Sequence, residues 1–507
     1  MAMVDISLVA IEAIKRSIAQ VKTHCLSVSL SPYFMASPSL VRILEICKVT
    51  PALDSVDAAK EFSLPLTYFD ITWFKFPPAE CLYFFKLNES SSRPSIFHSQ
   101  ILPALKHSLS QTLGRFVPLA GHLTWPANSS KPVIVYALND ALSLRVAESN
   151  ASFDRFIGNE IREADESHPY IPELYVTNMI ASLLALQITF FPRKGFSIGM
   201  AIHHAMLDGK SVSMFLNTWA YLCKHNQNEK SLLLLPELRP SFDRTGLQDS
   251  FGLESVYLKQ WEATIIPVSE LNSRSLKLMP YLGVPSNLLR ATFRLPREAI
   301  NELKESVQRY HQAGLNPGKQ LHLSTYVITC AYVSVCLVKA RGGDDNRKVY
   351  YVCSVDCRSR LEPPLPQNYF GNCVAVHHMA AEAKAFMEEN GVAIVAEKLS
   401  DLINGLENGL FQGAKERLVM LRGLGQEVQK FGVAGSTRLG FYGLDFGWGN
   451  VEKAEITSID RTRGFSMMEF GDVSSGGTEV GVVLVRQEME RFASLFVNGL
   501  KALQSRL

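Results

Sequence analysis

Alternating apolar and polar residues predict strands through the first half of the chain, and apolar residues three or four apart predict helices between them. We expect strands at 40–51, 81–87, 133–138, 142–147, 184–191 and 196–204. We expect helices at 101–116 and 211–224. This mixture of elements predicts an α/β fold for the first half.

Two local features refine this prediction. Asn139-Asp140 is a turn signal, so we expect the strands 133–138 and 142–147 to form a hairpin. Residues 64–80 are rich in aromatic side chains and proline. We therefore expect an extended segment that crosses a core there, and no helix.

The second half repeats the mixed pattern after a stretch of weak periodicity. Strands are expected at 290–295, at 347–361 as far as Asp356, at 454–461 and at 478–485. Helices are expected at 296–314, 321–340, 380–412 and 488–503. The weak stretch, 226–285, predicts a crossover between a first domain of residues 35–225 and a second domain of residues 286–507.

The first 34 residues fall outside this pattern. They are partly amphipathic, but they lack the continuous apolar region and the cleavage site of a secretory signal. We expect residues 1–34 to form a poorly ordered extension, with a weak organelle-transit segment as the alternative. No stretch approaches the roughly 18 apolar residues of a membrane helix, so no membrane partner is expected.

The charge balance and the cysteines narrow the class of partner. The chain has 51 Lys and Arg against 49 Asp and Glu. Nucleic-acid binding normally requires a basic excess, so nucleic acid is not an expected partner. Several of the nine cysteines stand in apolar runs without the paired spacing of a zinc site. We expect buried free thiols in a reducing, cytoplasmic setting, and no bound metal.

The first candidate for chemistry is HHAMLDG, from His203 to Gly209, which follows a strand and precedes a helix. Reactive side chains often stand at the carboxyl end of a strand, and a neutral imidazole can accept a proton from a hydroxyl. We therefore predict His204 as a general base. Asp208 follows across a turn, so we expect it to hold the loop by pairing with Arg358. His203 alternates with His204 and should face a core.

Two further motifs lie in the second half. Asp445 to Gly449 reads DFGWG, where two glycines around a tryptophan predict a tight loop with close backbone approach. The other motif reads YFGNC, from Tyr369 to Cys373. His378 and Glu382 repeat the spacing of the histidine and aspartate above, but without its context, and we expect them to be surface residues.

HHAMLDG and DFGWG, in this order and at this separation, resemble the plant BAHD acyltransferase family. YFGNC and the segments at 64–80, 105–126 and 241–247 are similar to the subgroup that acylates anthocyanin, flavonoid and other phenolic glycosides, many with malonyl-CoA. The resemblance covers about 38–503. It implies two similar chloramphenicol-acetyltransferase-like α/β domains, with a solvent channel between them from which His204 is reached.

The resemblance also implies roles for single residues. His204 matches the general base and Asp208 the structural aspartate beside it, while Asp445 is sometimes treated as a second acid/base group. Ser324 and Thr325 match a position that contacts the donor, and Trp448 is expected on the same substrate side. Structural roles are expected for Arg358, Gly209, Phe446, Gly447, Gly449, Tyr369, Phe370, Gly371, Asn372 and Cys373.

These expectations predict an enzyme, an acyl-CoA-dependent O-acyltransferase. It would move an acyl group, malonyl first, from CoA to a sugar hydroxyl of a phenolic, flavonoid or anthocyanin glucoside. We expect direct transfer through a ternary complex, without an acyl-enzyme. We expect acyl-CoA as co-substrate, no bound cofactor and a monomer.

Four alternatives stay open. A hydroxycinnamoyl-CoA would require an apolar donor pocket in place of a cation for the malonyl carboxylate. An acyltransferase of the chloramphenicol or lipoamide type shares HxxxDG but lacks DFGWG. A metallohydrolase could use His203, His204 and Asp208 as ligands, although adjacent strand residues face opposite ways. A binding protein without catalysis is the fourth, and transfer activity would exclude it.

Overall fold

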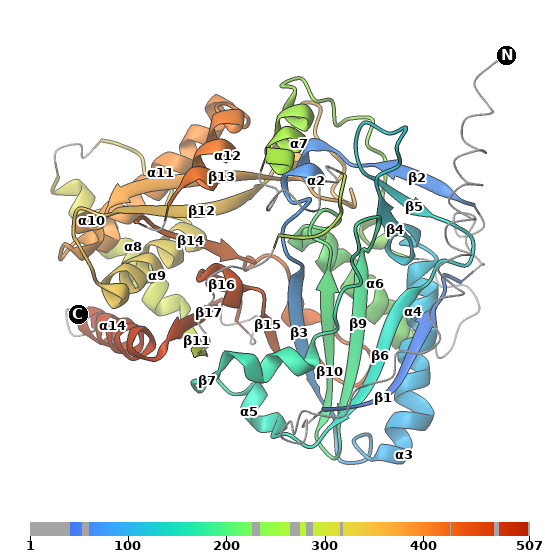
Figure 1. Ribbon diagram of the computed structural model, residues 1–507. Helices are drawn as coiled ribbons and strands as arrows, with labels where there is room; N and C mark the ends of the chain where they lie inside the picture. Colours follow the sequence, from blue (N-terminus) through green and yellow to red (C-terminus); the bar gives the residue numbers. More distant parts are fainter. Residues whose placement is uncertain are drawn as a thin grey trace, which may run out of the picture. The chain divides into compact units, whose positions relative to one another are not determined.

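Two large mixed sheets and one small antiparallel sheet organise the chain (Figure 1). The computed structural model describes residues 41–52, 60–225, 234–263, 274–279, 287–314, 318–425, 427–470 and 476–504. All of these residues belong to one unit, Val41–Leu507. The expectations for residues 1–34, and for 226–233, 264–273 and 280–285 of the predicted crossover, lie outside the described residues.

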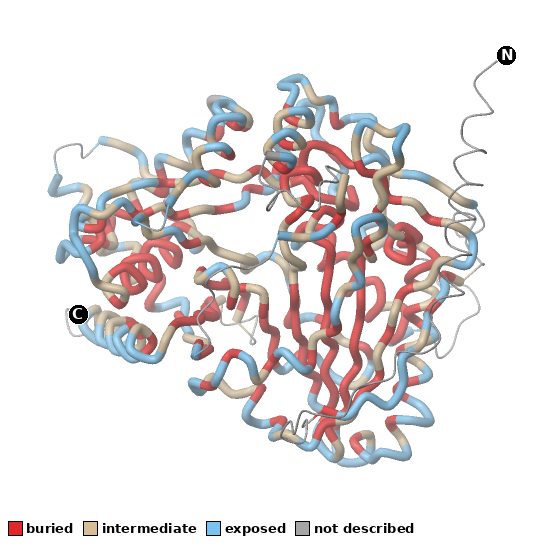
Figure 2. Tube along the Cα trace, in the orientation of Figure 1, coloured by how far each residue is buried: buried red, intermediate tan, exposed pale blue. Residues whose placement is uncertain are grey.

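The six-stranded sheet contains most of the strands predicted for the first half. In spatial order its strands are β1 (Val41–Val49), β6 (Leu142–Ser149), β9 (Leu184–Phe191), β10 (Gly195–Ile202), β3 (Ala79–Lys86) and β15 (Val451–Ile456). Only β6 and β9 are parallel neighbours. Helices α4 (Leu102–Leu113) and α6 (Gly209–His225) pack together behind the sheet, and β9 and β10 are buried along their whole length (Figure 2).

The seven-stranded sheet belongs mainly to the second half. In spatial order its strands are β13 (Val374–Glu382), β12 (Lys348–Asp356), β14 (Gln429–Ala434), β16 (Phe465–Glu469), β17 (Thr478–Val485), β11 (Leu288–Leu295) and β7 (Arg162–Glu163). Its helices are α8 (Arg297–Gln312), α9 (Thr325–Arg341), α11 (Gly391–Gly405) and α14 (Arg486–Gln504). The apolar helix α9 contacts the other three, which explains why its residues are buried on nearly every side.

The small sheet and the short helices complete the described fold. The small sheet has the strands β2 (Phe62–Pro65), β5 (Val133–Tyr136), β4 (His122–Thr124) and β8 (Ile180–Ser182). The remaining α-helices are α2 (Tyr68–Thr72), α3 (Pro94–Ile96), α5 (Phe153–Ile157), α7 (Leu253–Ala263), α10 (Lys384–Met387), α12 (Ala414–Gly423) and α13 (Ile459–Thr462).

Each half of the chain contributes a strand to the other half's sheet. Strand β15 pairs with β3, and β7 pairs with β11. Arg162 of β7 and Glu455 of β15 form a buried ion pair in which Nη2 and a carboxylate oxygen lie 2.6 Å apart. Because the strand that follows DFGWG belongs to the six-stranded sheet, this motif is fixed against the first half although it lies in the second.

The expected extended segment at 64–80 was wrong in its centre, where α2 forms. Thr67 and Asp70 make a reciprocal capping box, with the Thr67 backbone nitrogen 2.9 Å from Asp70 Oδ2. This local cap stabilises one short helix within an otherwise irregular stretch. The aromatic side chains, which suggested an extended crossing, instead pack around that helix.

The expected hairpin at Asn139-Asp140 was also wrong. The turn forms, with Asn139 at φ 76° and the Asp140 amide donating to the Ala137 carbonyl. However, β5 belongs to the small sheet and β6 to the six-stranded sheet. The chain changes sheets at this turn because the two strands bury their apolar residues against different partners.

The helix predicted at 380–412 was wrong at its start and is interrupted. Strand β13 continues to Glu382, paired with Lys348 of β12, so His378 and Glu382 lie on a strand. His378 is half-buried and Glu382 is exposed. Two helices, α10 and α11, then replace the single helix. The strand predicted at 454–461 likewise ends at Ile456, and the other predicted strands and helices are present within a few residues.

Candidate active site

His204 lies directly after the carboxyl end of β10, as the sequence pattern predicts. Strand β10 ends at Ile202, and α6 begins at Gly209, so residues 203–208 form the connection between a buried strand and a helix. The His203 amide donates to the Leu183 carbonyl, and the Met206 amide donates to the His203 carbonyl. These bonds make a tight turn that fixes where His204 leaves the sheet.

The His204 imidazole stacks on an aromatic side chain. Its ring lies parallel to the Trp73 indole, with the ring centroids 4.4 Å apart and an interplanar angle of 12°. Phe76 lies nearby, with its ring tilted by 60° and its centroid 6.1 Å from the imidazole. Burial lowers the pKa of His204 to about 4, against smaller opposing effects of its own backbone and Asp208. The ring is therefore neutral at physiological pH and can accept a proton.

His203 faces the core, as the alternation of side chains predicts. It is fully buried, and its Nδ1 accepts a hydrogen bond of 3.3 Å from the Ala205 amide. Burial lowers the pKa of His203 to about 3, so it too is neutral. Its neutral ring belongs to the packing of the loop, and it points into the protein.

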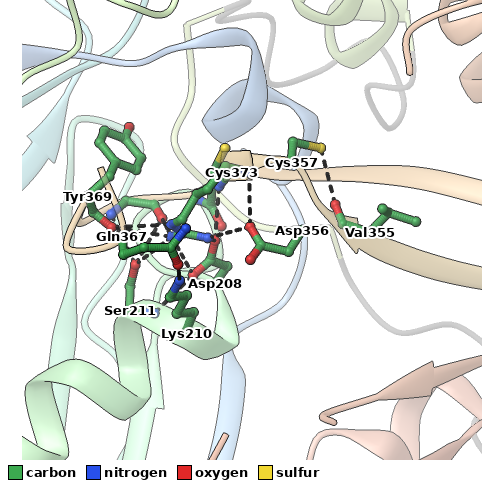
Figure 3. A network of polar contacts seen from close by, with 12 residues as sticks. Asp208, Lys210, Ser211, Val355, Asp356, Cys357, Gln367, Tyr369 and Cys373 are labelled. Atoms are coloured by element: carbon green, nitrogen blue, oxygen red, sulfur yellow. Dashed lines mark hydrogen bonds and ion pairs between the residues drawn. The ribbon is translucent and has the colours of Figure 1, made fainter. Parts of the chain in front are cut away.

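Asp208 forms the ion pair with Arg358 that the sequence suggested. Figure 3 shows Asp208 within a network of polar contacts that includes Ser211 and Cys373. Arg358 Nη1 lies 2.9 Å from Asp208 Oδ2, and Nη2 lies 3.1 Å from Oδ1. The carboxylate also accepts backbone hydrogen bonds of 2.9 Å from Ser211 and from Cys373. Because all these partners are buried, the carboxylate is committed to holding the loop in place.

The YFGNC motif runs alongside this loop. Ser211 Oγ donates to the Gly371 carbonyl at 2.9 Å, and Asn372 Nδ2 donates to the His204 carbonyl at 3.1 Å. Tyr369 and Phe370 are fully buried, and Phe370 packs against Phe116 and Phe242. The motif therefore forms hydrogen bonds with His204, Asp208 and Ser211.

The DFGWG motif stands at the other end of α6. Asp445 Oδ2 lies 2.6 Å from Nζ of Lys224, near the end of that helix, and Oδ1 accepts from the amides of Gly447 and Gly449. Burial opposes ionisation, but Lys224 and the two amides outweigh it and lower the pKa of Asp445. Gly209 and Lys224 are separated by about 22 Å at 1.5 Å per residue. Asp445 thus pairs far from the His204 loop.

The other residues of this motif act in packing. Phe446 is buried edge-on against Phe85 and Trp219, with centroids 5.3 and 5.0 Å away. Gly447 has φ 105°, a conformation that side chains rarely adopt, so glycine is needed at this position. Trp448 is half-buried and packs at the edge of the core.

Ser324 and Thr325 stand at the start of α9. Ser324 caps the helix, and its Oγ accepts from the Val327 amide at 3.3 Å. Thr325 is the first helical residue and is exposed. Neither residue has a described contact with the loop 203–208.

Several functional contacts could not be predicted from the motifs. Trp73, which stacks on His204, comes from the segment predicted as extended. Asp70 accepts from Asn372 Nδ2 at 3.2 Å and pairs with Arg244 Nη1 at 3.1 Å. The only sequence signal for them was that their segments, 64–80 and 241–247, carry family-like residues.

The described part of the chain has neither the side-chain arrangement of a metal site nor a helix suited to a membrane. There, no group of three or more His, Cys, Asp or Glu side chains is arranged to hold a metal ion. No helix of that part has both the length and the apolar character needed to cross a membrane. The eight described cysteines are free thiols, and all but Cys47 are buried.

The model of the Transferase family matches residues 41–497. A malonyl-CoA:anthocyanidin 5-O-glucoside-6''-O-malonyltransferase of Arabidopsis thaliana is 43% identical over 471 residues, 91% of this chain and 99% of that protein. An agmatine coumaroyltransferase of the same plant is 39% identical over 465 residues, 90% of this chain and 98% of that protein.

Solved structures show the same fold at lower identity. The crystal structure of vinorine synthase matches with a TM-score of 0.64 and 21% identity, over 90% of this chain and 98% of that chain. The predicted fold class, an α/β fold of two chloramphenicol-acetyltransferase-like halves, is confirmed.

Proposed function

The chain belongs to the BAHD family of acyl-CoA-dependent acyltransferases, and on that premise we propose that it transfers a malonyl group from malonyl-CoA to a sugar hydroxyl of a phenolic, flavonoid or anthocyanin glucoside. The family model and the malonyltransferase relative support this reaction. The observation that carries the proposal is the neutral His204, fixed at the end of β10 and stacked on Trp73.

His204 acts as the general base. Its imidazole accepts the proton of the acceptor hydroxyl while the hydroxyl oxygen attacks the thioester carbonyl carbon. A carbon–oxygen bond forms, and the tetrahedral intermediate collapses by breaking the carbon–sulfur bond. The CoA thiolate leaves with the proton that His204 returns. A lowered imidazole pKa favours this return, because the imidazolium is then a strong acid.

The other candidate residues serve this base in different ways. Asp208 and Arg358 hold the His204 loop by their buried ion pair. Asp445 holds the DFGWG loop through Lys224, and its position near the end of α6 supports a structural role over an acid/base role. Ser324, Thr325 and Trp448 are proposed to contact the CoA donor.

We place the substrate channel between the two halves, residues 35–225 and 286–507, which exchange β7 and β15. Acyl-CoA and the glycoside would enter from opposite mouths and meet at His204. The protein is proposed to act as a cytoplasmic monomer without a bound cofactor.

A hydroxycinnamoyl-CoA donor is the second candidate. The agmatine coumaroyltransferase is 39% identical to this chain, which shows that similar sequences carry an aromatic acyl transferase name. Trp73 and Phe76 beside His204 also supply apolar surface. The two donors differ chemically in one decisive way, since malonyl carries a free carboxylate that requires a cation and coumaroyl carries a planar ring.

The experiment is a donor panel with the purified full chain. Malonyl-CoA, acetyl-CoA and p-coumaroyl-CoA are each incubated with a set of phenolic glucosides, and acylated products are identified by mass. We expect transfer from malonyl-CoA at the highest kcat/KM. A preference for p-coumaroyl-CoA would establish the second candidate, and no transfer from any donor would contradict the proposed function.

A further inference from the structure

Asn372 links the YFGNC motif to Asp70 in the segment 64–80 and, through Asp70, to Arg244 in the segment 241–247. Asn372 has no exposed surface. Its Nδ2 donates to two acceptors, the His204 carbonyl oxygen at 3.1 Å and Asp70 Oδ1 at 3.2 Å. Both distances are within the normal range for N–H···O hydrogen bonds.

The chemistry of the two acceptors fixes the orientation of this amide. A backbone carbonyl and a carboxylate can only accept hydrogen bonds, whereas the amide nitrogen carries two hydrogens. A side chain of this size therefore satisfies both acceptors only with its NH₂ group turned toward them. An aspartate at position 372 would place acceptors against acceptors, and a leucine would leave both unsatisfied.

Asp70 is itself held rigidly, so it can act as the fixed point. It is fully buried, its Oδ2 accepts from the backbone nitrogen and Oγ1 of Thr67 at 2.9 Å, and it pairs with Arg244. The backbone on the other side of Asn372 is equally fixed. Gly371 at φ 147° is bonded to Ser211 Oγ through both its carbonyl and its amide, and Cys373 donates to Asp208.

The carbonyl that Asn372 holds belongs to the proposed base. His204 Nδ1 is buried and makes no hydrogen bond to another described residue, so no neighbouring residue orients the imidazole through this nitrogen. The direction of the ring then depends on the backbone of residue 204 and on the Trp73 stack. A backbone carbonyl anchored through Asn372 to Asp70 restricts the backbone at residue 204 itself.

We propose that Asn372 is a positioning residue, which orients the His204 imidazole toward the acceptor hydroxyl by tying the His204 carbonyl to the buried Asp70–Arg244 pair. This inference rests on the proposed function of His204 as base. Asp208 and Arg358 hold the end of the loop, and Asn372 holds its beginning. Without the hydrogen bond from Asn372 to the His204 carbonyl, the loop stays folded but the imidazole is misplaced.

A double-mutant cycle of Asn372→Leu and His204→Ala tests this role in the full chain. We expect Asn372→Leu to lower kcat about 100-fold, the scale of a misplacement of about 1 Å, with both KM values within about threefold of wild type. In the His204→Ala background the same substitution should change the residual rate less than about threefold. The matched control is Asn368→Leu, because Asn368 donates to the Arg239 carbonyl at 2.7 Å without touching the loop.

The outcomes separate the two claims. A loss of the same size in both backgrounds would show a general structural role and overturn the inference, as would an Asn372→Leu enzyme with wild-type kcat. If His204→Ala keeps full activity, the proposed base fails whatever Asn372 does. Should Asn372→Leu not fold by circular dichroism, Asn372→Ser, which leaves room for a water molecule, replaces it in the cycle with the same expectation.

Discussion

The loops at the two ends of α6 use the same chemistry at different depths. At one end Asp208 accepts two backbone hydrogen bonds and pairs with Arg358. At the other end Asp445 accepts two backbone hydrogen bonds and pairs with Lys224. The side chains of the first pair are 1% and 2% exposed, whereas Lys224 is 46% and Asp445 20% exposed.

This difference in burial predicts different consequences for similar substitutions. Removing one partner of a buried ion pair leaves the other charge buried without a counter-charge or water. In an exposed pair, water solvates the remaining charge, so the loss of stability is small. The loop that carries the proposed base is therefore fixed by the interior of the protein. The DFGWG loop is fixed mainly by its glycines, by Phe446 and by the pairing of β15.

The largest expected effect is on stability at Asp208. Asp208→Ala should lower the free energy of unfolding by about 3–5 kcal/mol, because Arg358 is left buried without its main counter-charge. Chemical denaturation measures this loss. Asp356→Ala is the matched control, since Asp356 also pairs with Arg358 but is 47% exposed, and should cost at most about 1 kcal/mol. Equal losses in the two variants would contradict the comparison.

The second expected effect is on the pH dependence of activity, which should depend on the His204 loop and not on the DFGWG loop. Burial holds the pKa of His204 at about 4, and only the neutral ring is a base, so kcat/KM should fall tenfold per unit as pH drops below that value. An ordinary histidine would place this limb near pH 6.5. Rates measured after brief exposure to each pH give the profile. Asp445→Asn should leave the limb in place, and a shifted limb in that variant would give Asp445 a part in proton transfer.

A smaller effect is expected on stability at Asp445. Asp445→Ala should cost about 1 kcal/mol, the usual scale for hydrogen bonds and a half-exposed ion pair, with kcat within about threefold of wild type. Thermal unfolding and steady-state rates with the preferred donor measure the two quantities. A loss of activity without loss of stability would contradict a loop-holding role.

The smallest effect is expected at Lys224. Lys224→Met should lower the free energy of unfolding by about 0.5 kcal/mol at neutral pH. Lys224 helps to keep the pKa of Asp445 below its ordinary value, so the stabilisation by Asp445 is present above that value and is lost as pH falls through the lowered pKa. In Lys224→Met this loss of stability should begin at a higher pH. If the unfolding free energies of wild type and Lys224→Met fall over the same pH range, Lys224 does not stabilise the Asp445 carboxylate.

The sequence predicted the parts of the site that lie close together along the chain. A strand followed by a turn and a helix placed His204, and the need to neutralise a loop carboxylate suggested Arg358 at the end of another strand. The contacts of Asn372 with His204 and of Trp73 with His204 join residues more than 100 positions apart, and no local pattern encodes such pairs. The crossing of β15 into the first sheet escaped prediction for the same reason.

The central claim is that His204 is the base, and its most direct test is the rate of malonyl transfer by His204→Ala beside His203→Asn at saturating substrates. Loss of a general base lowers kcat by about 10²–10⁴-fold. We predict a loss on this scale in His204→Ala, with the KM for malonyl-CoA within about threefold of wild type. His203→Asn, which keeps an acceptor for the Ala205 amide, should stay within about tenfold. Wild-type kcat in a folded His204→Ala enzyme would contradict the account.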